Sequence, residues 1–138
     1  MTSAISAPSP QRADFDAPRL RVAICEPDAQ LRALLGEWLQ RGRYEPVYGA
    51  EGAAAADVEL VIADVPAPRQ DGAASIARLR RHFPQAKVLA ISGQFLPGVH
   101  GANTAAAALG ADAMLAKPFA AKAFVEAVRS LTCREPRV

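Results

Sequence analysis

The chain has 138 residues, a length that suits one domain with a single hydrophobic core rather than two. Apolar residues make up 51% of the sequence and aromatic residues only 6%, so the core must be built mainly from Ala, Leu and Val. The 16 basic and 14 acidic residues are spread along the chain without a nucleic-acid-binding motif, which argues against a nucleic-acid partner.

The N-terminal part of the chain divides into a tail and a strand-helix-strand unit. Residues 1–18 are rich in Ser, Ala and Pro and contain no long apolar stretch, so we expect a flexible tail without a signal peptide or membrane span, on a cytoplasmic protein. Leu20–Cys25 predicts the first strand. A helix follows, because five apolar residues recur at the spacing of one helical face: Leu31, Leu34, Leu35, Trp38 and Leu39. Gly42 ends this helix, and Tyr44–Tyr48 predicts the second strand.

The middle of the chain repeats the alternation of strand and helix. Ala50–Ala56 is a weak, Ala-rich helix candidate, and Val58–Ala63 is typical of a strand buried on both faces. A Pro-containing loop, Val65–Gly72, leads into a helix that Pro84 stops. The inner face of that helix carries three apolar residues: Ile76, Leu79 and Phe83.

The remaining elements complete five strand-then-helix repeats. Lys87–Ile91 predicts the fourth strand, Ala102–Leu109 a helix and Ala113–Ala116 the fifth strand. The last helix carries four apolar residues on one face: Phe124, Ala127, Val128 and Leu131. Alternation of this kind predicts a parallel sheet with helices on both faces. We therefore expect one folded domain over residues 19–132 and a short C-terminal tail over residues 133–138.

Residues suited to phosphoryl chemistry follow four of the five predicted strands. In parallel sheets, ligands collect outside the C-terminal ends of the strands, where residues that are distant in sequence meet. The residues at these ends are Glu26 and Asp28, Asp64, Ser92, and Lys117 followed by Pro118. Each one alone has an ordinary explanation as a helix cap or loop residue, but the ordered set points to one site.

This ordered set resembles the receiver domain of two-component response regulators, over roughly residues 20–131. Its most specific parts are two short motifs: Asp64 with Pro68, Asp71 and Gly72 behind it, and Gly110-Ala111-Asp112 leading into Lys117-Pro118-Phe119. The resemblance implies an α/β, flavodoxin-like, doubly wound sheet of five parallel strands in the order 2-1-3-4-5. It also implies a stand-alone phosphoprotein of a phosphorelay, with no conventional enzyme activity beyond self-phosphorylation and autodephosphorylation at Asp64.

The same resemblance assigns roles to individual residues. Asp64 would accept a phosphoryl group from a histidine kinase or phosphotransfer protein, and Lys117 and the hydroxyl of Ser92 would each contact a phosphoryl oxygen. The Lys117–Pro118 bond is cis in the family. Mg²⁺ would be held by a ligand set drawn from three places: Asp64, the acidic loop with Glu26 and Asp28, and the backbone carbonyl of Pro66.

The acidic loop departs from the family pattern. Receivers usually have two adjacent acids after the first strand, whereas this chain has Glu26 followed by Pro27. Asp28 is either a substitute metal ligand or the N-cap of the following helix, and the sequence leaves both interpretations open. We expect weaker Mg²⁺ binding than in receivers with two acids.

Two further departures concern Met114 and the stretch Gly93–Asn103. Many receivers have Tyr or Phe three residues before the lysine, and that ring rotates inward when the hydroxyl of the site moves. This chain has Met114 there, which we interpret as core filler on an edge strand rather than as a residue that passes on the signal. Gly93–Asn103 is long for a connection and carries Phe95 and Leu96, so it is either a partner contact or a disordered insertion. His100 within it reads as a solvated loop residue.

Two functions follow from these features. The first is phosphorylation at Asp64 with output through contact with a downstream protein, without nucleic acid or membrane. The alternative is a pseudo-receiver, an interaction module with the same fold that is not phosphorylated. A nucleotide-binding enzyme has little support, because the first strand is not followed by a Gly-rich phosphate loop. Cys25 reads as a buried small hydrophobe, and with Cys133 it indicates neither a disulfide framework nor a zinc site.

Overall fold

The computed structural model describes residues 19–49, 57–94, 99–100 and 104–132. Within these ranges one sheet has the strand order β2-β1-β3-β4-β6-β5. Its strands are β1 (Arg21–Cys25), β2 (Glu45–Tyr48), β3 (Val58–Asp64), β4 (Lys87–Ser92), β5 (Val99–His100) and β6 (Ala113–Ala116). The helices are α2 (Ala29–Arg41), the one-turn π-helix η3 (Pro68–Gly72), α3 (Ala73–His82), α4 (Thr104–Leu109) and α5 (Ala121–Thr132).

The parallel part of the sheet confirms the predicted flavodoxin-like order. Without β5, the strands follow one another across the sheet as the second, first, third, fourth and fifth of the chain. β5 is an addition, because it pairs antiparallel with Met114 and Leu115 of β6. It lies in the stretch predicted as a long loop, so His100 belongs to a strand and the prediction of a loop residue was wrong.

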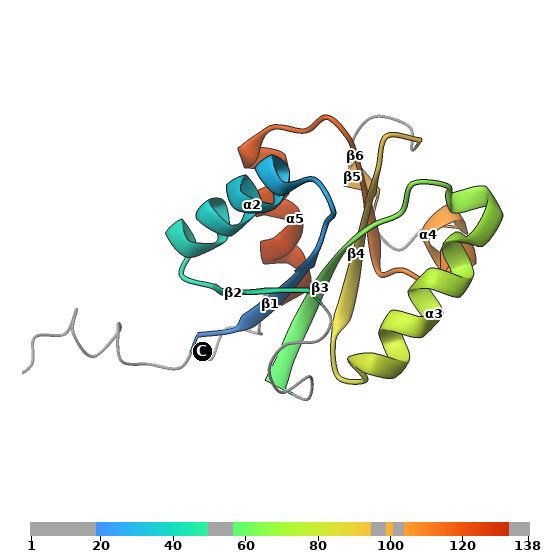
Figure 1. Ribbon diagram of the computed structural model, residues 1–138, viewed down its shortest axis with the longest axis horizontal. Helices are drawn as coiled ribbons and strands as arrows, with labels where there is room; N and C mark the ends of the chain where they lie inside the picture. The colour runs from blue at the N-terminus through green and yellow to red at the C-terminus, as the bar shows by residue number, and fades with distance from the viewer. Residues whose placement is uncertain (1–18, 50–56, 95–98, 101–103, 133–138) are drawn as a thin grey trace, which may run out of the picture.

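Helices cover both faces of this sheet, with α2 and α5 on one side and α3 and α4 on the other (Figure 1). Successive side chains of a strand point to opposite faces, so the sheet separates two cores. The core under α2 and α5 includes Val22, Ile24, Leu35, Leu39, Leu60, Ile62, Phe124 and Val128. The core under α3 and α4 includes Ala23, Val61, Ala63, Ile76, Val88, Ala90, Leu109 and Met114.

Helix α2 shows how the sequence sets the limits of an element. Asp28 Oδ1 accepts hydrogen bonds from the backbone N–H groups of Gln30 and Leu31, at 2.9 and 3.1 Å, and so caps the first turn. Gly42 follows the last turn, as predicted, and its N–H donates back to Trp38 and Leu39. The helix is thereby placed directly behind the end of β1.

Some local predictions were wrong. The chain becomes helical at Pro68, although Val65–Gly72 was predicted to be a loop. Leu34, predicted on the inner face of α2, is 40% exposed. Met114 is buried, as expected of core filler, but β6 is not an edge strand because β5 pairs along it. Cys25 is only partly buried.

Several predictions concern parts of the chain outside the described residues. These are the two tails with Cys133, the helix candidate Ala50–Ala56, and Phe95 and Leu96. Among the helices in the described ranges, none has the length and apolar character needed to cross a membrane.

Candidate functional site

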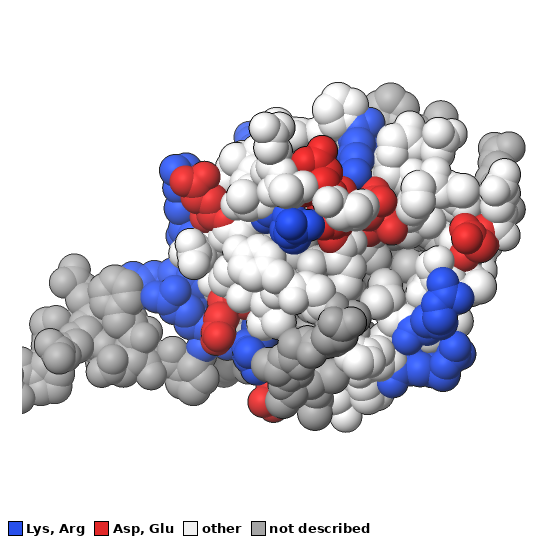
Figure 2. All heavy atoms as spheres, in the orientation of Figure 1, with Lys and Arg blue, Asp and Glu red and all other residues white. Residues whose placement is uncertain are grey.

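The centre of the site is an ammonium group shared by two carboxylates. Lys117, just after β6, places its Nζ 2.8 Å from Oδ1 of Asp64 at the end of β3 and 2.9 Å from Oε1 of Glu26 just after β1. The three residues lie far apart in sequence, and the parallel strands bring them together as predicted. Figure 2, drawn in the orientation of Figure 1, shows acidic and basic side chains gathered in the upper middle of the view, over the ends of β1 and β3.

The balance of burial and charge at Lys117 favours its protonated form. Burial alone lowers the pKa of Lys117, but the close contacts with Asp64 and Glu26 and the charges of both carboxylates outweigh it, so the pKa is raised above its usual value. Lys117 therefore carries a full positive charge at neutral pH. The next peptide bond, Lys117–Pro118, is cis, as predicted.

Glu26 is the most deeply buried acid of the site. Its side chain is only 1% exposed, compared with 11% for Asp64. Oε2 accepts a hydrogen bond of 3.0 Å from the backbone N–H of Asp28. Oε1 lies beside Lys117 but has no well-directed hydrogen bond. The charge of this buried oxygen is balanced by the Lys117 ammonium at 2.9 Å.

The predicted acidic loop contributes one of its two acids to this cluster. Glu26 points into the site, whereas Asp28 is exposed and its Oδ1 is engaged in capping α2. The N-cap interpretation of Asp28 is therefore confirmed. Its role as a metal ligand stays a prediction, which the capping geometry does not favour.

Ser92 is held in place at the end of β4. The residue is fully buried, and its Oγ accepts a hydrogen bond of 3.0 Å from the backbone N–H of Gln94. A hydroxyl that already accepts one hydrogen bond keeps its own proton for donation. The backbone around it is tied to the site as well, because the N–H of Lys117 donates to the carbonyl of Ser92 at 3.0 Å.

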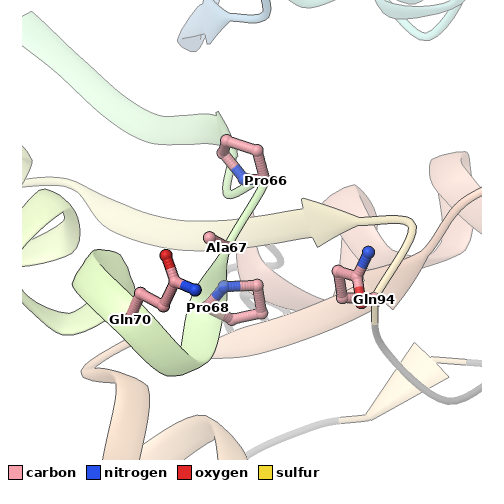
Figure 3. A pocket seen from close by; sticks show the side chains of 5 residues that line it. All are labelled: Pro66, Ala67, Pro68, Gln70 and Gln94. Atoms are coloured by element: carbon pink, nitrogen blue, oxygen red, sulfur yellow. The ribbon is translucent and has the colours of Figure 1, made fainter.

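An open pocket of about 530 Å³ lies next to these strand ends. It is lined by Pro66, Ala67 and Pro68 from the segment after β3, by Gln70 of η3, and by Gln94 from beyond β4 (Figure 3). Pro66 is exposed and stands two residues after Asp64, so the residue whose carbonyl is the predicted ligand is one of those that line this pocket.

The donor set fits a divalent cation, although sparsely. Mg²⁺ sites in proteins commonly use one or two carboxylates together with water and phosphate oxygens. Glu26 and Asp64 supply two carboxylates that meet at one point, and Oε1 of Glu26 lacks a directed hydrogen bond. Within the described part of the chain, no three acidic, His or Cys side chains form a metal-binding group.

Arg32 is a residue of this region that the sequence did not single out. It lies in the first turn of α2, and its guanidinium NH1 donates to the backbone carbonyls of Glu26 and Pro27, at 2.8 and 3.3 Å. The one signal in the sequence that could have drawn attention to Arg32 is its place in the first turn of a predicted helix. A cation there is unfavourable because the N-terminal end of a helix carries a partial positive charge.

Comparison with known proteins places these features in a family. A family model for the response regulator receiver domain matches residues 22–129. A search of curated proteins gives no match.

Solved structures with the same fold agree with the family match. A response regulator from Thermotoga maritima is 16% identical, with a TM-score of 0.65 over 85% of this chain and 100% of that chain. A response regulator receiver protein from Burkholderia phymatum is 21% identical, with a TM-score of 0.63 over 87% of this chain and 100% of that chain. A response regulator protein from Burkholderia pseudomallei, solved with a phosphorylated aspartic acid, a calcium ion and citrate, is 20% identical, with a TM-score of 0.59 over 83% of this chain and 67% of that chain. At these identities the likeness shows the fold.

Proposed function

Because the chain belongs to the response regulator receiver family, we propose that it accepts a phosphoryl group on Asp64 from a histidine kinase or phosphotransfer protein and signals by contact with a downstream protein. The observation that carries this proposal is the position of Lys117 Nζ, 2.8 Å from Asp64 and 2.9 Å from Glu26 at the C-terminal ends of the strands. An acceptor carboxylate and a fixed positive charge are the two groups that phosphoryl transfer needs from the protein.

The transfer step would form one bond at phosphorus as another breaks. A carboxylate oxygen of Asp64 attacks the phosphorus of a phosphohistidine, and the P–N bond breaks as the imidazole leaves with its electron pair. Lys117 stays beside the new aspartyl phosphate as a compact positive charge. Ser92, whose Oγ accepts from Gln94, has its proton free to donate to a phosphoryl oxygen.

Mg²⁺ is the proposed cofactor, held by Asp64 and Glu26, with the Pro66 carbonyl and Asp28 as further candidates. When bound, it would neutralise charge on the phosphoryl oxygens. The Burkholderia pseudomallei structure contains both a phosphorylated aspartic acid and a calcium ion, and by analogy we infer that a divalent cation accompanies phosphorylation of this chain. Because Pro27 stands where the second acid of the family would be, we infer that the affinity is lower than in receivers with two acids.

Output would depend on the charge that phosphorylation adds. An aspartyl phosphate brings negative charge and acceptor oxygens to the strand ends, which biases nearby loops between two arrangements. The segment after Ser92 begins at this point and includes Gln94 on the wall of the pocket. A partner that reads the phosphorylated state would therefore contact this side of the domain.

The test is incubation with Mg²⁺ and a small phosphodonor such as acetyl phosphate, followed by mass spectrometry of the intact protein. We expect one phosphoryl adduct on the natural chain and none on Asp64→Asn. Asp71→Asn is the matched control, since Asp71 is an exposed acid seven residues further along, and it should be labelled like the natural chain. No adduct on the natural chain at high Mg²⁺ would contradict the proposal and favour the pseudo-receiver, which Pro27 and the capping role of Asp28 support.

A further inference from the structure

We propose that Arg32 is a positioning residue that holds Glu26 in place beside Lys117; this inference rests on the function proposed above. The guanidinium NH1 of Arg32 donates to two consecutive carbonyls of the acidic loop, at 2.8 Å to Glu26 and 3.3 Å to Pro27. Both bonds run from the first turn of α2 back to the end of β1. They fix the backbone from which the Glu26 side chain enters the site.

Helix stability does not account for an arginine at this place. The N-terminal end of a helix carries a partial positive charge, so a cation in the first turn is electrostatically unfavourable. The carboxylate at this end of α2 belongs to the N-cap Asp28, and the hydrogen bonds of the Arg32 guanidinium run to backbone carbonyls rather than to it. Arg32 is also only partly exposed, which restricts its freedom in solvent. Its contacts with the two carbonyls are therefore the interactions that account for its position.

The acidic loop depends on such an external donor because of its sequence. Pro27 has no N–H, so it cannot donate a hydrogen bond to hold the turn from within. The other restraints are the N–H of Asp28, which donates to Glu26 Oε2, and the capping bonds of Asp28 Oδ1. Glu26 is therefore held at two points. Arg32 binds its backbone carbonyl, and the N–H of Asp28 binds its carboxylate.

The consequence reaches Asp64 through Lys117. The ammonium is shared between Glu26 and Asp64, so its position depends on both carboxylates. If Glu26 moves, Lys117 is held by Asp64 alone and loses one of its two anchors. Displacements on the order of 1 Å strongly affect reaction rates in preorganised sites, so loss of Arg32 should slow phosphorylation of Asp64.

Chemical labelling of lysine tests the positioning role without any phosphorylation. The chain has three lysines, and Lys87 and Lys122 are exposed and serve as internal references. We expect Arg32→Gln to raise the rate of Lys117 acetylation, relative to these references, by about three- to tenfold. The reason is that Glu26 moves away and Lys117 loses its charged contact with that carboxylate. Arg32→Lys keeps a cationic donor and should lie closer to the natural chain.

Arg41→Gln is the matched control. Arg41 is on the same helix and makes an exposed ion pair with Glu37 at 3.7 Å, so its loss removes the same charge without touching the acidic loop. It should leave Lys117 labelling unchanged. Equal labelling of Lys117 in Arg32→Gln and Arg41→Gln, with Trp38 fluorescence showing both variants folded, would overturn the proposal.

A double-variant comparison tests whether Arg32 acts through Glu26. Arg32→Gln should slow labelling of Asp64 by a small phosphodonor by about tenfold in the natural background and cause no further loss in a Glu26→Gln background. An equal loss in both backgrounds would show that Arg32 does not act through Glu26. If the natural chain takes up no phosphate, the proposed function fails, while lysine labelling still decides the positioning role.

Discussion

The indole of Trp38 meets the ring of Phe119 edge-on, with 6.5 Å between the ring centroids. Phe119 stands two residues after Lys117 and also stacks on Phe124 of α5, at 5.9 Å. Trp38 is the only tryptophan of the chain. Its fluorescence therefore reports on a ring attached to the same short segment as the lysine of the site.

Phosphorylation of Asp64 should change the emission of Trp38. If Lys117 shifts toward a phosphoryl group, the segment that carries Phe119 shifts with it, and the environment of the indole changes. The measurement is the emission spectrum of Trp38 before and after addition of Mg²⁺ and acetyl phosphate. Asp64→Asn should show no change, and a change that persists in this variant would contradict the assignment.

Restoring an acid at Pro27 should strengthen Mg²⁺ binding. Pro27→Asp adds a carboxylate beside Glu26, and we expect the dissociation constant for Mg²⁺ to fall by about tenfold, because affinity follows the number of charged ligands. Isothermal titration calorimetry gives the constant. Ala29→Asp, an exposed position two residues further on, adds the same charge outside the predicted site. If the two variants bind Mg²⁺ equally, position 27 is not part of the metal site.

Replacing Gly72 with alanine should destabilise the fold. A Cβ at this position would lie 2.7 Å from Cδ1 of Leu109 and 3.1 Å from Cγ1 of Val65, so Gly72→Ala overpacks the contact between η3 and α4. We expect a loss of about 1–3 kcal/mol in the free energy of unfolding, measured by urea denaturation. Gly93→Ala is the control, since its Cβ meets no atom within 4 Å, and it should change stability little.

Asp112 should matter more for stability than its partner Arg80. Oδ2 of Asp112 accepts hydrogen bonds from the backbone N–H of Val88 and from Arg80 NH2, both at 2.8 Å. Asp112→Ala leaves the Val88 N–H without this acceptor, at a cost of about 1–3 kcal/mol. Arg80→Ala removes a half-exposed ion pair worth less than about 1 kcal/mol and an exposed hydrogen bond from Nε to the Gly110 carbonyl, whose acceptor can turn to water instead. Urea denaturation of both variants gives the order, and the reverse order would contradict the role given to Val88.

Cys25 should react slowly with alkylating agents. Burial raises the pKa of the Cys25 thiol, and the thiolate is the reactive form. In a Cys133→Ser background, the rate of alkylation by iodoacetamide should rise with pH at a higher midpoint than in the urea-unfolded chain. A midpoint equal to that of the unfolded chain would show that the thiol is solvated.

The raised pKa of Cys25 should make the folded state less stable as the pH becomes alkaline. Below the thiol pKa of the unfolded chain, about 8.5, both states hold the proton and Cys25 contributes no pH dependence. As the pH rises from there through the higher pKa of the folded state, the unfolded state loses its proton first, so stability falls. Cys25→Ala should remove this part of the alkaline loss, as measured by thermal unfolding at increasing pH.

The regular elements could be predicted from the sequence because their signals are local. The apolar run of β3 indicated a strand covered on both faces, and Leu60, Val61, Ile62 and Ala63 are at most 2% exposed. Gly42 indicated the end of α2. The parallel order of the strands then brought Glu26, Asp64 and Lys117 together, so these contacts followed from topology rather than from any local motif.

The errors arose where tertiary contacts decide the local structure. The prolines of Val65–Gly72 predict a loop, but proline is tolerated in a first helical turn, and the close approach of Leu109 to Gly72 packs this segment against α4. β5 is stabilised by pairing with β6. Because β5 has only two residues, its sequence is too short to show the pattern of a strand. Leu34 fits the apolar spacing of α2 but lies at the margin of the buried face. The bond from Arg32 to the acidic loop depends on a side-chain conformation that no sequence pattern specifies.

The two outer strands of the sheet have a further consequence for solution behaviour. An unpaired strand edge is a template for association with other chains, and short or proline-containing edges reduce that hazard. β2 has four residues and includes Pro46, and β5 has two. Both margins of the described sheet therefore offer few backbone groups for irreversible aggregation, which suits a domain whose proposed partners must bind and leave through side-chain surfaces.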